Sequence, residues 1–113
     1  MKKFIVLYQA KPELMQQMSQ STPEEQAKGM EEWMNWAKKC GDKLVDLGAP
    51  LTNAMKILPD GKSSTGNNDV AGYSVLQASS LDEAKSLLKG HPHLTWDASC
   101  SIEIHETMPI PGA

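Results

Sequence analysis

The sequence has few cysteines and few aromatic residues, and it lacks long apolar runs. Only 2 cysteines occur in 113 residues, Cys40 and Cys100, and they form no C-x-x-C motif. We expect two reduced, largely buried thiols in a cytoplasmic protein, although the sequence alone leaves pairing open. No apolar stretch approaches the roughly 18 residues that span a membrane, so no membrane partner is expected.

Strong charge of either sign is also missing. The chain carries 11 basic and 14 acidic residues, a net charge of −3, and its only adjacent lysines are Lys2-Lys3 and Lys38-Lys39. A basic footprint for nucleic acid is therefore absent, and we expect no nucleic-acid partner. The N-terminus resembles the start of a signal peptide, but its apolar part stops at Tyr8 and no small-residue cleavage site follows. We interpret it as a first strand of a single domain, residues 1–113.

Three segments have the residue pattern of β-strands. Lys3 to Gln9 is a compact apolar run of the length of a buried strand, and Val70 to Ala78 is similar. Ser101 to Thr107 alternates cleanly, with Ile102 and Ile104 on one face and Glu103 and His105 on the other. A fourth, weaker strand is expected within Leu51 to Leu58.

Two helices carry strong start signals. Thr22, Pro23 and Glu25 form a capping box, and apolar residues at helical spacing predict a helix continuing to Leu47, bent near Gly41. Ser80 and Glu83 form a second capping box, and that helix should end at Gly90. Residues 13–20 are expected to form a short helix or a turn, residues 59–69 a surface loop (or a lid), and residues 108–113 an irregular tail.

The predicted order is β-α-β-β-α-β, which defines an α+β, ferredoxin-like fold with an antiparallel sheet. Both helices should cover one face of this sheet. Tyr8, Tyr73 and Val75 are strand residues whose apolar bulk is expected on the opposite, bare face. Face-to-face pairing of two copies would cover it, so we expect a homodimer.

Several of these segments resemble the YCII-related family, a branch of the dimeric α/β-barrel superfamily. The resemblance is carried by Gly72-Tyr73, the helix start Ser80-Leu-Asp-Glu-Ala84, the following Pro92 and Leu47-Gly-Ala-Pro-Leu51. It extends over nearly the whole chain in element order. It implies a homodimer with two sheets packed face to face and a small cleft in each subunit, in a family whose members are mostly of unassigned function.

The chain departs from that family at two positions. Members with a proposed His–Asp catalytic pair have an early histidine, and here no histidine precedes His91. The Asp-Gly-Pro-Phe signature of one sub-branch is replaced by Asp69-Val-Ala-Gly72. The resemblance therefore supplies no catalytic pair for this chain.

The candidate catalytic residues are His91, His93, His105 and Glu103. In an extended segment, His91 and His93 would point the same way, and the final strand places Glu103 and His105 on one face. Histidine titrates near neutral pH, so His93 or His105 beside a carboxylate would suit general acid–base catalysis. The same four residues are the alternative of a zinc site. No recognised metal spacing such as H-E-x-x-H is present, so we expect no metal and no cofactor.

The candidate ligand-binding residues are Trp36, Tyr73, Trp96 and Asp69. Trp36 lies toward the edge of the apolar helix stripe, and Trp96 follows the histidines, so both are candidate walls of a cleft. Trp33, Met30 and Met34 are expected in the core. No G-x-S-x-G elbow or phosphate loop is present, which argues against nucleophilic or nucleotide chemistry.

Two functions fit this pattern. The first is an enzyme of lyase or isomerase type that performs acid–base chemistry on a small molecule. The second is a non-catalytic ligand-binding or interaction module, favoured by the missing early histidine. The sequence does not decide between them.

Overall fold

The computed structural model describes residues 1–66 and 69–112. A four-stranded antiparallel sheet forms its centre, with strand order β2-β5-β1-β6. The elements, in chain order, are β1 Lys2–Gln9, α1 Pro12–Ser19, α2 Pro23–Cys40, the 3-10 turn η1 Gly41–Lys43, β2 Leu44–Pro50, β3 Met55–Ile57, β4 Ser63–Thr65, β5 Val70–Ala78, α3 Leu81–Leu87, α4 Pro92–Trp96 and β6 Ser101–Glu106.

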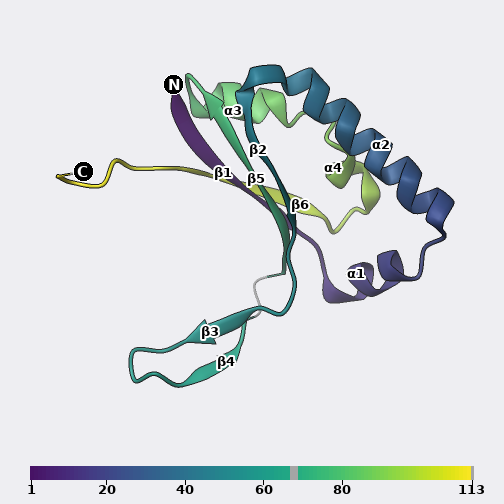
Figure 1. Cartoon of the computed structure of the whole chain (residues 1–113), viewed down its shortest axis with the longest axis horizontal. Helices are drawn as coiled ribbons and strands as arrows, with labels where there is room; N and C mark the ends of the chain where they lie inside the picture. Colours follow the sequence, from purple (N-terminus) through teal and green to yellow (C-terminus); the bar gives the residue numbers. More distant parts are fainter. Residues whose placement is uncertain (67–68, 113) are drawn as a thin grey trace.

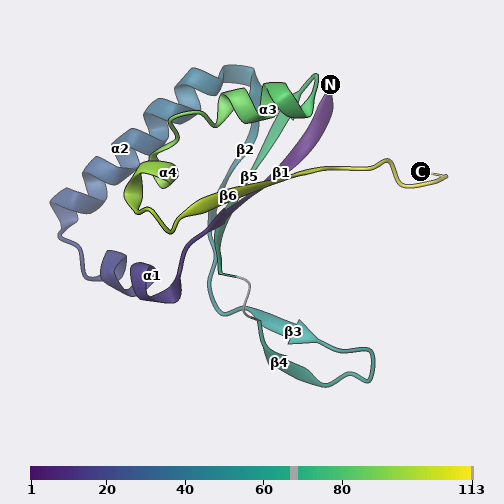
Figure 2. The same cartoon turned by 180° about the vertical axis from the view of Figure 1, so that it is seen from behind.

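The strand order and the helices between the strands confirm the predicted α+β, ferredoxin-like fold. Figures 1 and 2 show α2, α3 and α4 on one side of the sheet. Both predicted N-cap residues are confirmed at the helix N-termini. The Thr22 side chain accepts a hydrogen bond from the Glu25 amide, and Ser80 accepts one from the Glu83 amide.

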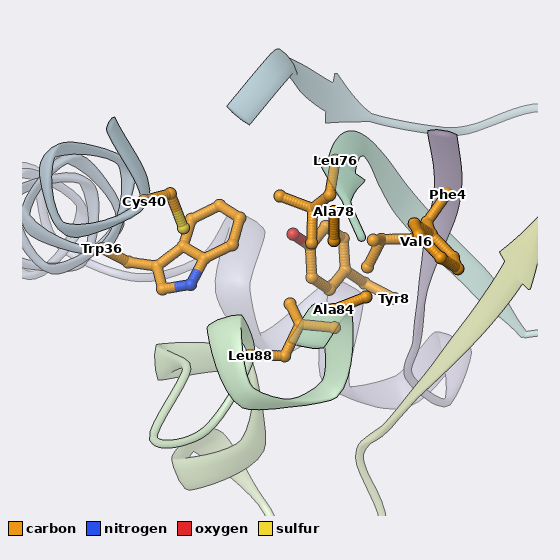
Figure 3. Packing of buried hydrophobic residues seen from close by; sticks show 9 residues of the cluster. All are labelled: Phe4, Val6, Tyr8, Trp36, Cys40, Leu76, Ala78, Ala84 and Leu88. Carbon is orange, nitrogen blue, oxygen red and sulfur yellow. The ribbon is translucent and has the colours of Figure 1, made fainter. Parts of the chain in front are cut away.

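The core lies between the helices and the covered face of the sheet (Figure 3). Alternate residues of β1 and β5 enter it because neighbouring residues of a strand point to opposite faces. From the helices come Trp36 and Cys40 of α2, Ala84 of α3, and Leu88. The strand residues of the core are Phe4, Val6, Tyr8, Leu76 and Ala78.

The long helix is shorter than its apolar pattern predicts. It ends at Cys40, and Leu44–Pro50 is the edge strand β2, paired with β5, not a continuation to Leu47. Gly41 adopts a positive φ of 59° and ends the helix. Leu44 and Leu47 still pack against the core. In a regular strand, residues three apart face opposite sides, but the register shifts in β2 allow both leucines to face the core.

The segment predicted as a weak strand and a loop forms a separate hairpin. β3 pairs only with β4, within the described residues, and this hairpin projects away from the main sheet (Figure 1). The expected surface loop at 59–69 therefore contains a strand, and the tip alone, from Leu58 to Lys62, is a turn. Asn67 and Asn68, which belong to that predicted loop, lie outside the described residues. Residues 13–20, expected to form a short helix or a turn, belong mostly to the helix α1.

Three side chains face a direction other than the one predicted. Tyr8 is 2% exposed and lies in the core, not on the bare face, because it shares its face with Phe4 and Val6. Met30 and Met34 are 60% and 42% exposed, whereas Trp36 is buried. The buried stripe of α2 runs through positions 33, 36, 37 and 40, which leaves positions 30 and 34 beside it.

The bare face of the sheet is the side that none of the helices in residues 1–66 and 69–112 covers. Val75 and Tyr73 lie there as predicted, together with Ile5 and Leu7, and all four are half-buried. Their neighbours in each strand point into the core, so strand alternation places these four on the opposite side. This is the surface that the predicted dimer would cover.

Candidate functional site

The histidine segment forms a short helix rather than the extended segment that we predicted. Gly90 turns the chain with a φ of 73°, Pro92 occupies the first helical turn, and α4 follows. The His91 imidazole is the N-cap of this helix, because its Nδ1 accepts a hydrogen bond from the His93 amide at 2.9 Å. Proline at the first helical position favours this start over continued strand.

His91 is enclosed by aromatic rings and is 0% exposed. Its ring centroid lies 4.4 Å from that of Trp36, 4.5 Å from that of Trp33 and 5.0 Å from that of Tyr8. The Nδ1 atom accepts a hydrogen bond, so the neutral ring carries its proton on Nε2, which has no hydrogen-bond partner among the described residues. Burial, and secondly the neighbouring His93, lower the pKa of His91 to about 4.

His93 is buried and held by a hydrogen bond to the backbone of β1. It is 5% exposed, and its Nε2 is 2.9 Å from the backbone carbonyl oxygen of Gln9. A carbonyl only accepts, so Nε2 donates and the neutral ring keeps an unprotonated Nδ1. The ring also contacts Tyr8 and Trp96 edge to face, with centroids 5.4 Å and 6.0 Å away. This arrangement fixes both the tautomer and the orientation of His93.

Two hollows border α4 on different sides. One, of about 600 Å³, lies between α3, α4 and β6, with Leu88, Leu94, Ile102 and Ile104 as apolar walls and Lys85 and Lys89 among its other lining residues. The other, of about 370 Å³, lies between α2 and residues 89–95, lined by Trp36, Pro92 and Thr95 together with charged and polar residues. The first is the more apolar of the two.

The structure does not bring His105 and Glu103 to the other histidines. On β6 they pair with Ile5 and Leu7 of β1 and share the bare face, whereas His91 and His93 contact Tyr8 on the covered face. The His105 Nε2 and a Glu103 carboxylate oxygen contact each other, and both side chains are about half exposed, 55% and 50%. Strand alternation separates the two pairs of predicted residues, because a sheet lies between them.

The four-residue zinc alternative is consequently not assembled. Among the residues that the structure describes, no three His, Cys, Asp or Glu side chains come together as metal ligands would. Cys40 and Cys100 are both free thiols, the first buried and the second partly exposed. Burial raises the pKa of both thiols, so neither is an activated nucleophile.

The four predicted ligand-binding residues lie in different places. Trp36 is 5% exposed and its indole Nε1 donates to the Leu87 carbonyl at 2.8 Å, so it is a core residue that also borders the smaller hollow. Trp96 is 39% exposed beside His93. Tyr73 is on the bare face, where its hydroxyl donates to Asp46, and Asp69 is exposed next to the end of β1.

Sequence reasoning missed the polar chain beneath the site. The Tyr8 hydroxyl lies 2.8 Å from the Ser74 hydroxyl, which donates to the Leu47 carbonyl at 2.7 Å. Tyr8 is therefore the donor to Ser74, and burial raises the pKa of Tyr8 to about 12, which keeps it protonated. The alternation of Phe4, Val6 and Tyr8 was the signal that placed this hydroxyl in the core.

Comparison with known proteins supports the fold. No model of a protein family matches the sequence, and no curated protein does. Among solved structures, the chain is similar to 5-chloro-2-hydroxyhydroquinone dehydrochlorinase from Burkholderia phenoliruptrix AC1100, determined in complex with 2,5-dihydroxybenzoquinone. The two chains are 17% identical, the TM-score is 0.52, and the match covers 89% of this chain and 90% of that one. At this identity the likeness establishes the α+β fold alone.

The helices in the described part of the chain are also too short or too polar to span a membrane. None of its helices combines the length and the apolar character that crossing a bilayer requires.

Proposed function

We propose that this chain is a YCII-related enzyme that binds a small aromatic molecule beside α4 and uses His93 to accept or return a proton. One observation carries the proposal. His93 is nearly buried, and its Nε2 is held by the Gln9 carbonyl, so the unprotonated Nδ1 is the atom available for a proton. A general base needs a free lone pair within hydrogen-bond reach of the proton that it takes, and the fixed tautomer of His93 supplies the lone pair on Nδ1.

The larger hollow is the proposed place for the ring of the substrate. Ile102 in its wall pairs with Tyr8, whose ring contacts His93, and Leu94 in its wall follows His93 in the chain. Two lysines, Lys85 and Lys89, line it with one carboxylate, Asp82, and this excess of positive charge would favour an acidic ligand such as an ionised hydroxyquinone. The structural neighbour acts on a chlorinated hydroxyhydroquinone, and dehydrochlorination removes a proton and a chloride ion, which is chemistry that a neutral histidine can assist.

Two ligands from the neighbour provide the test. Calorimetric titration with 2,5-dihydroxybenzoquinone measures binding, and chloride release from 5-chloro-2-hydroxyhydroquinone measures turnover. His93→Gln keeps a side-chain donor for Gln9, and we expect it to retain binding while losing about 100-fold or more of the turnover rate. His105→Gln, an exposed histidine on the other face, is the matched control and should keep both.

A non-catalytic ligand-binding module is the second candidate. His91 and His93 each make a structural hydrogen bond, and no earlier histidine is present to pair with an aspartate. Binding of the quinone without chloride release would favour this function. Equal turnover by the wild type and His93→Gln would contradict the role of His93, and absence of binding would contradict both candidates.

We further propose that the protein acts as a homodimer joined through the bare sheet face. This face carries apolar side chains that no helix or strand among the described residues covers, those of Ile5, Leu7, Tyr73 and Val75. A second copy would remove these side chains from water, and this apolar burial would favour association. Sedimentation equilibrium of the wild type and of Val75→Asp tests it, and a monomeric wild type would contradict it.

A further inference from the structure

The β3–β4 hairpin, called the arm below, projects from the sheet with apolar side chains in solvent. Met55 and Ile57 are 68% and 71% exposed. They alternate with Lys56, and they pair with Thr65 and Ser63 in the register of the hairpin. Strand alternation therefore gives the arm one face with Met55 and Ile57 and an opposite face with Lys56 and its partner Ser64.

The arm has little within its own chain to stabilise it. A two-stranded hairpin alone is at best marginally stable in water. The tip is well formed, since Leu58 donates to the Lys62 carbonyl at 2.8 Å and the Asp60 carboxylate accepts from the Lys62 amide at 2.9 Å. Its two large apolar side chains are mostly in solvent, however, and so contribute almost no burial energy.

The direction of the arm points to what covers it. Figures 1 and 2 show that the arm and the C-terminal tail leave the sheet on the side away from α2 and α4. This is the side of the bare sheet face. The tail also exposes large apolar residues, Met108 at 84% and Ile110 at 74%. One side of the molecule therefore carries the bare face and two apolar projections.

We propose that the arm is a clasp that packs its Met55–Ile57 face against a second copy of this chain, beside the paired sheet faces. The proposal rests on the homodimer proposed above and adds a second contact to it. Two-fold symmetry explains the choice of occupant, because pairing of the two bare faces brings the arm and the apolar tail of each copy to the margin of the same interface. A stable interface buries about 800 Å² on each partner. The arm would add its own apolar area to that of the four half-buried residues of the bare face.

Opposite faces of the arm allow a matched experiment. The double variant Met55→Asp/Ile57→Asp introduces two aspartates on the apolar face. The control Lys56→Asp/Ser64→Asp introduces two aspartates on the polar face. Sedimentation equilibrium should give a dimer dissociation constant raised about tenfold or more by the first pair and changed less than about threefold by the second. Far-UV circular dichroism checks that each variant keeps its fold, as we expect because the arm is separate from the main sheet.

The outcomes separate the arm from the dimer. If Val75→Asp dissociates the dimer while Met55→Asp/Ile57→Asp does not, the arm is not a clasp and the sheet interface stands. If the wild type is a monomer at about 100 µM, both proposals are wrong. Hydrogen–deuterium exchange supplies a second measurement. Amides of residues 55–65 should be protected at about 100 µM and exchange rapidly at a concentration where the dimer dissociates, and equal exchange at both would overturn the clasp.

Discussion

The imidazole of His91 stacks on the ring of Tyr8, with the centroids 5.0 Å apart and the planes inclined by 29°. Two indoles, Trp33 and Trp36, meet the same imidazole edge to face. A titratable ring thus occupies a place that an apolar side chain usually fills. Its charged form is disfavoured there, so we expect the fold to lose stability in acid.

The first prediction concerns this acid sensitivity. The pKa of His91 is lowered from 6.5 to about 4 in the folded protein, so the unfolded chain binds the proton more tightly. The contribution of neutral His91 to the free energy of unfolding is therefore complete above pH 6.5 and is lost as the pH falls toward 4. It should cost about 2 kcal/mol of unfolding free energy at pH 5 and about 3 kcal/mol below pH 4. Urea unfolding across this range measures it.

His91→Phe provides the comparison for that experiment. This variant keeps an aromatic ring between the tryptophans but cannot be protonated. It loses the N-cap hydrogen bond to the His93 amide, so its stability at pH 7 should be about 1 kcal/mol lower. Its decline between pH 6.5 and 4 should nevertheless be much smaller. An unchanged decline would assign the acid sensitivity to other groups.

The second prediction concerns Trp36. Its indole Nε1 donates to the Leu87 carbonyl at 2.8 Å and its ring is 5% exposed, so Trp36→Phe removes both a hydrogen bond and core volume. We expect a loss of about 2–3 kcal/mol in unfolding free energy. Trp96→Phe alters an indole that is 39% exposed and should cost less than about 1 kcal/mol. Equal costs in chemical denaturation would contradict the burial argument.

The third prediction separates the two hydroxyls of the buried polar chain. Tyr8→Phe removes a donor, but Ser74 still donates to the Leu47 carbonyl, so the cost should be about 1 kcal/mol. Ser74→Ala leaves both the Tyr8 hydroxyl and that carbonyl without this partner, and should cost about 2–3 kcal/mol. Thermal unfolding of the two variants and of the double variant measures the coupling. A larger effect from Tyr8→Phe would contradict the proposed donor and acceptor roles in these hydrogen bonds.

The fourth prediction compares two glycines. Gly48 in β2 has a φ of 78°, and a Cβ there would lie 1.7 Å from the Tyr73 carbonyl oxygen. Gly48→Ala should therefore cost more than about 3 kcal/mol or prevent folding. Gly29 lies within α2 with nothing within 4 Å of an added Cβ, so Gly29→Ala should raise stability by about 0.5–1 kcal/mol. Differential scanning calorimetry of both variants decides the comparison, and a tolerated Gly48→Ala would contradict the strand geometry.

The sequence by itself determined the local signals of the fold. Thr22 and Ser80 cap their helices as predicted, because a capping hydrogen bond spans only three residues and needs no distant partner. The strands at residues 3–9, 70–78 and 101–106 are also marked by their own composition and alternation. For the same reason the faces of Ile102 and His105 on β6 follow directly from the sequence.

Only the tertiary structure decided where these elements meet. Leu44 and Leu47 fit a helix stripe as well as a strand, and pairing with β5 selected the strand. The histidines were expected to converge, but the sheet separates His105 from His93, because face and register are set by partners far away in the chain. The alternation of β1 marks Tyr8 as a core residue, but only the pairing of β1 with β5 brings Ser74 to its hydroxyl. Long-range pairing, which leaves no local trace in the sequence, thus built the candidate site.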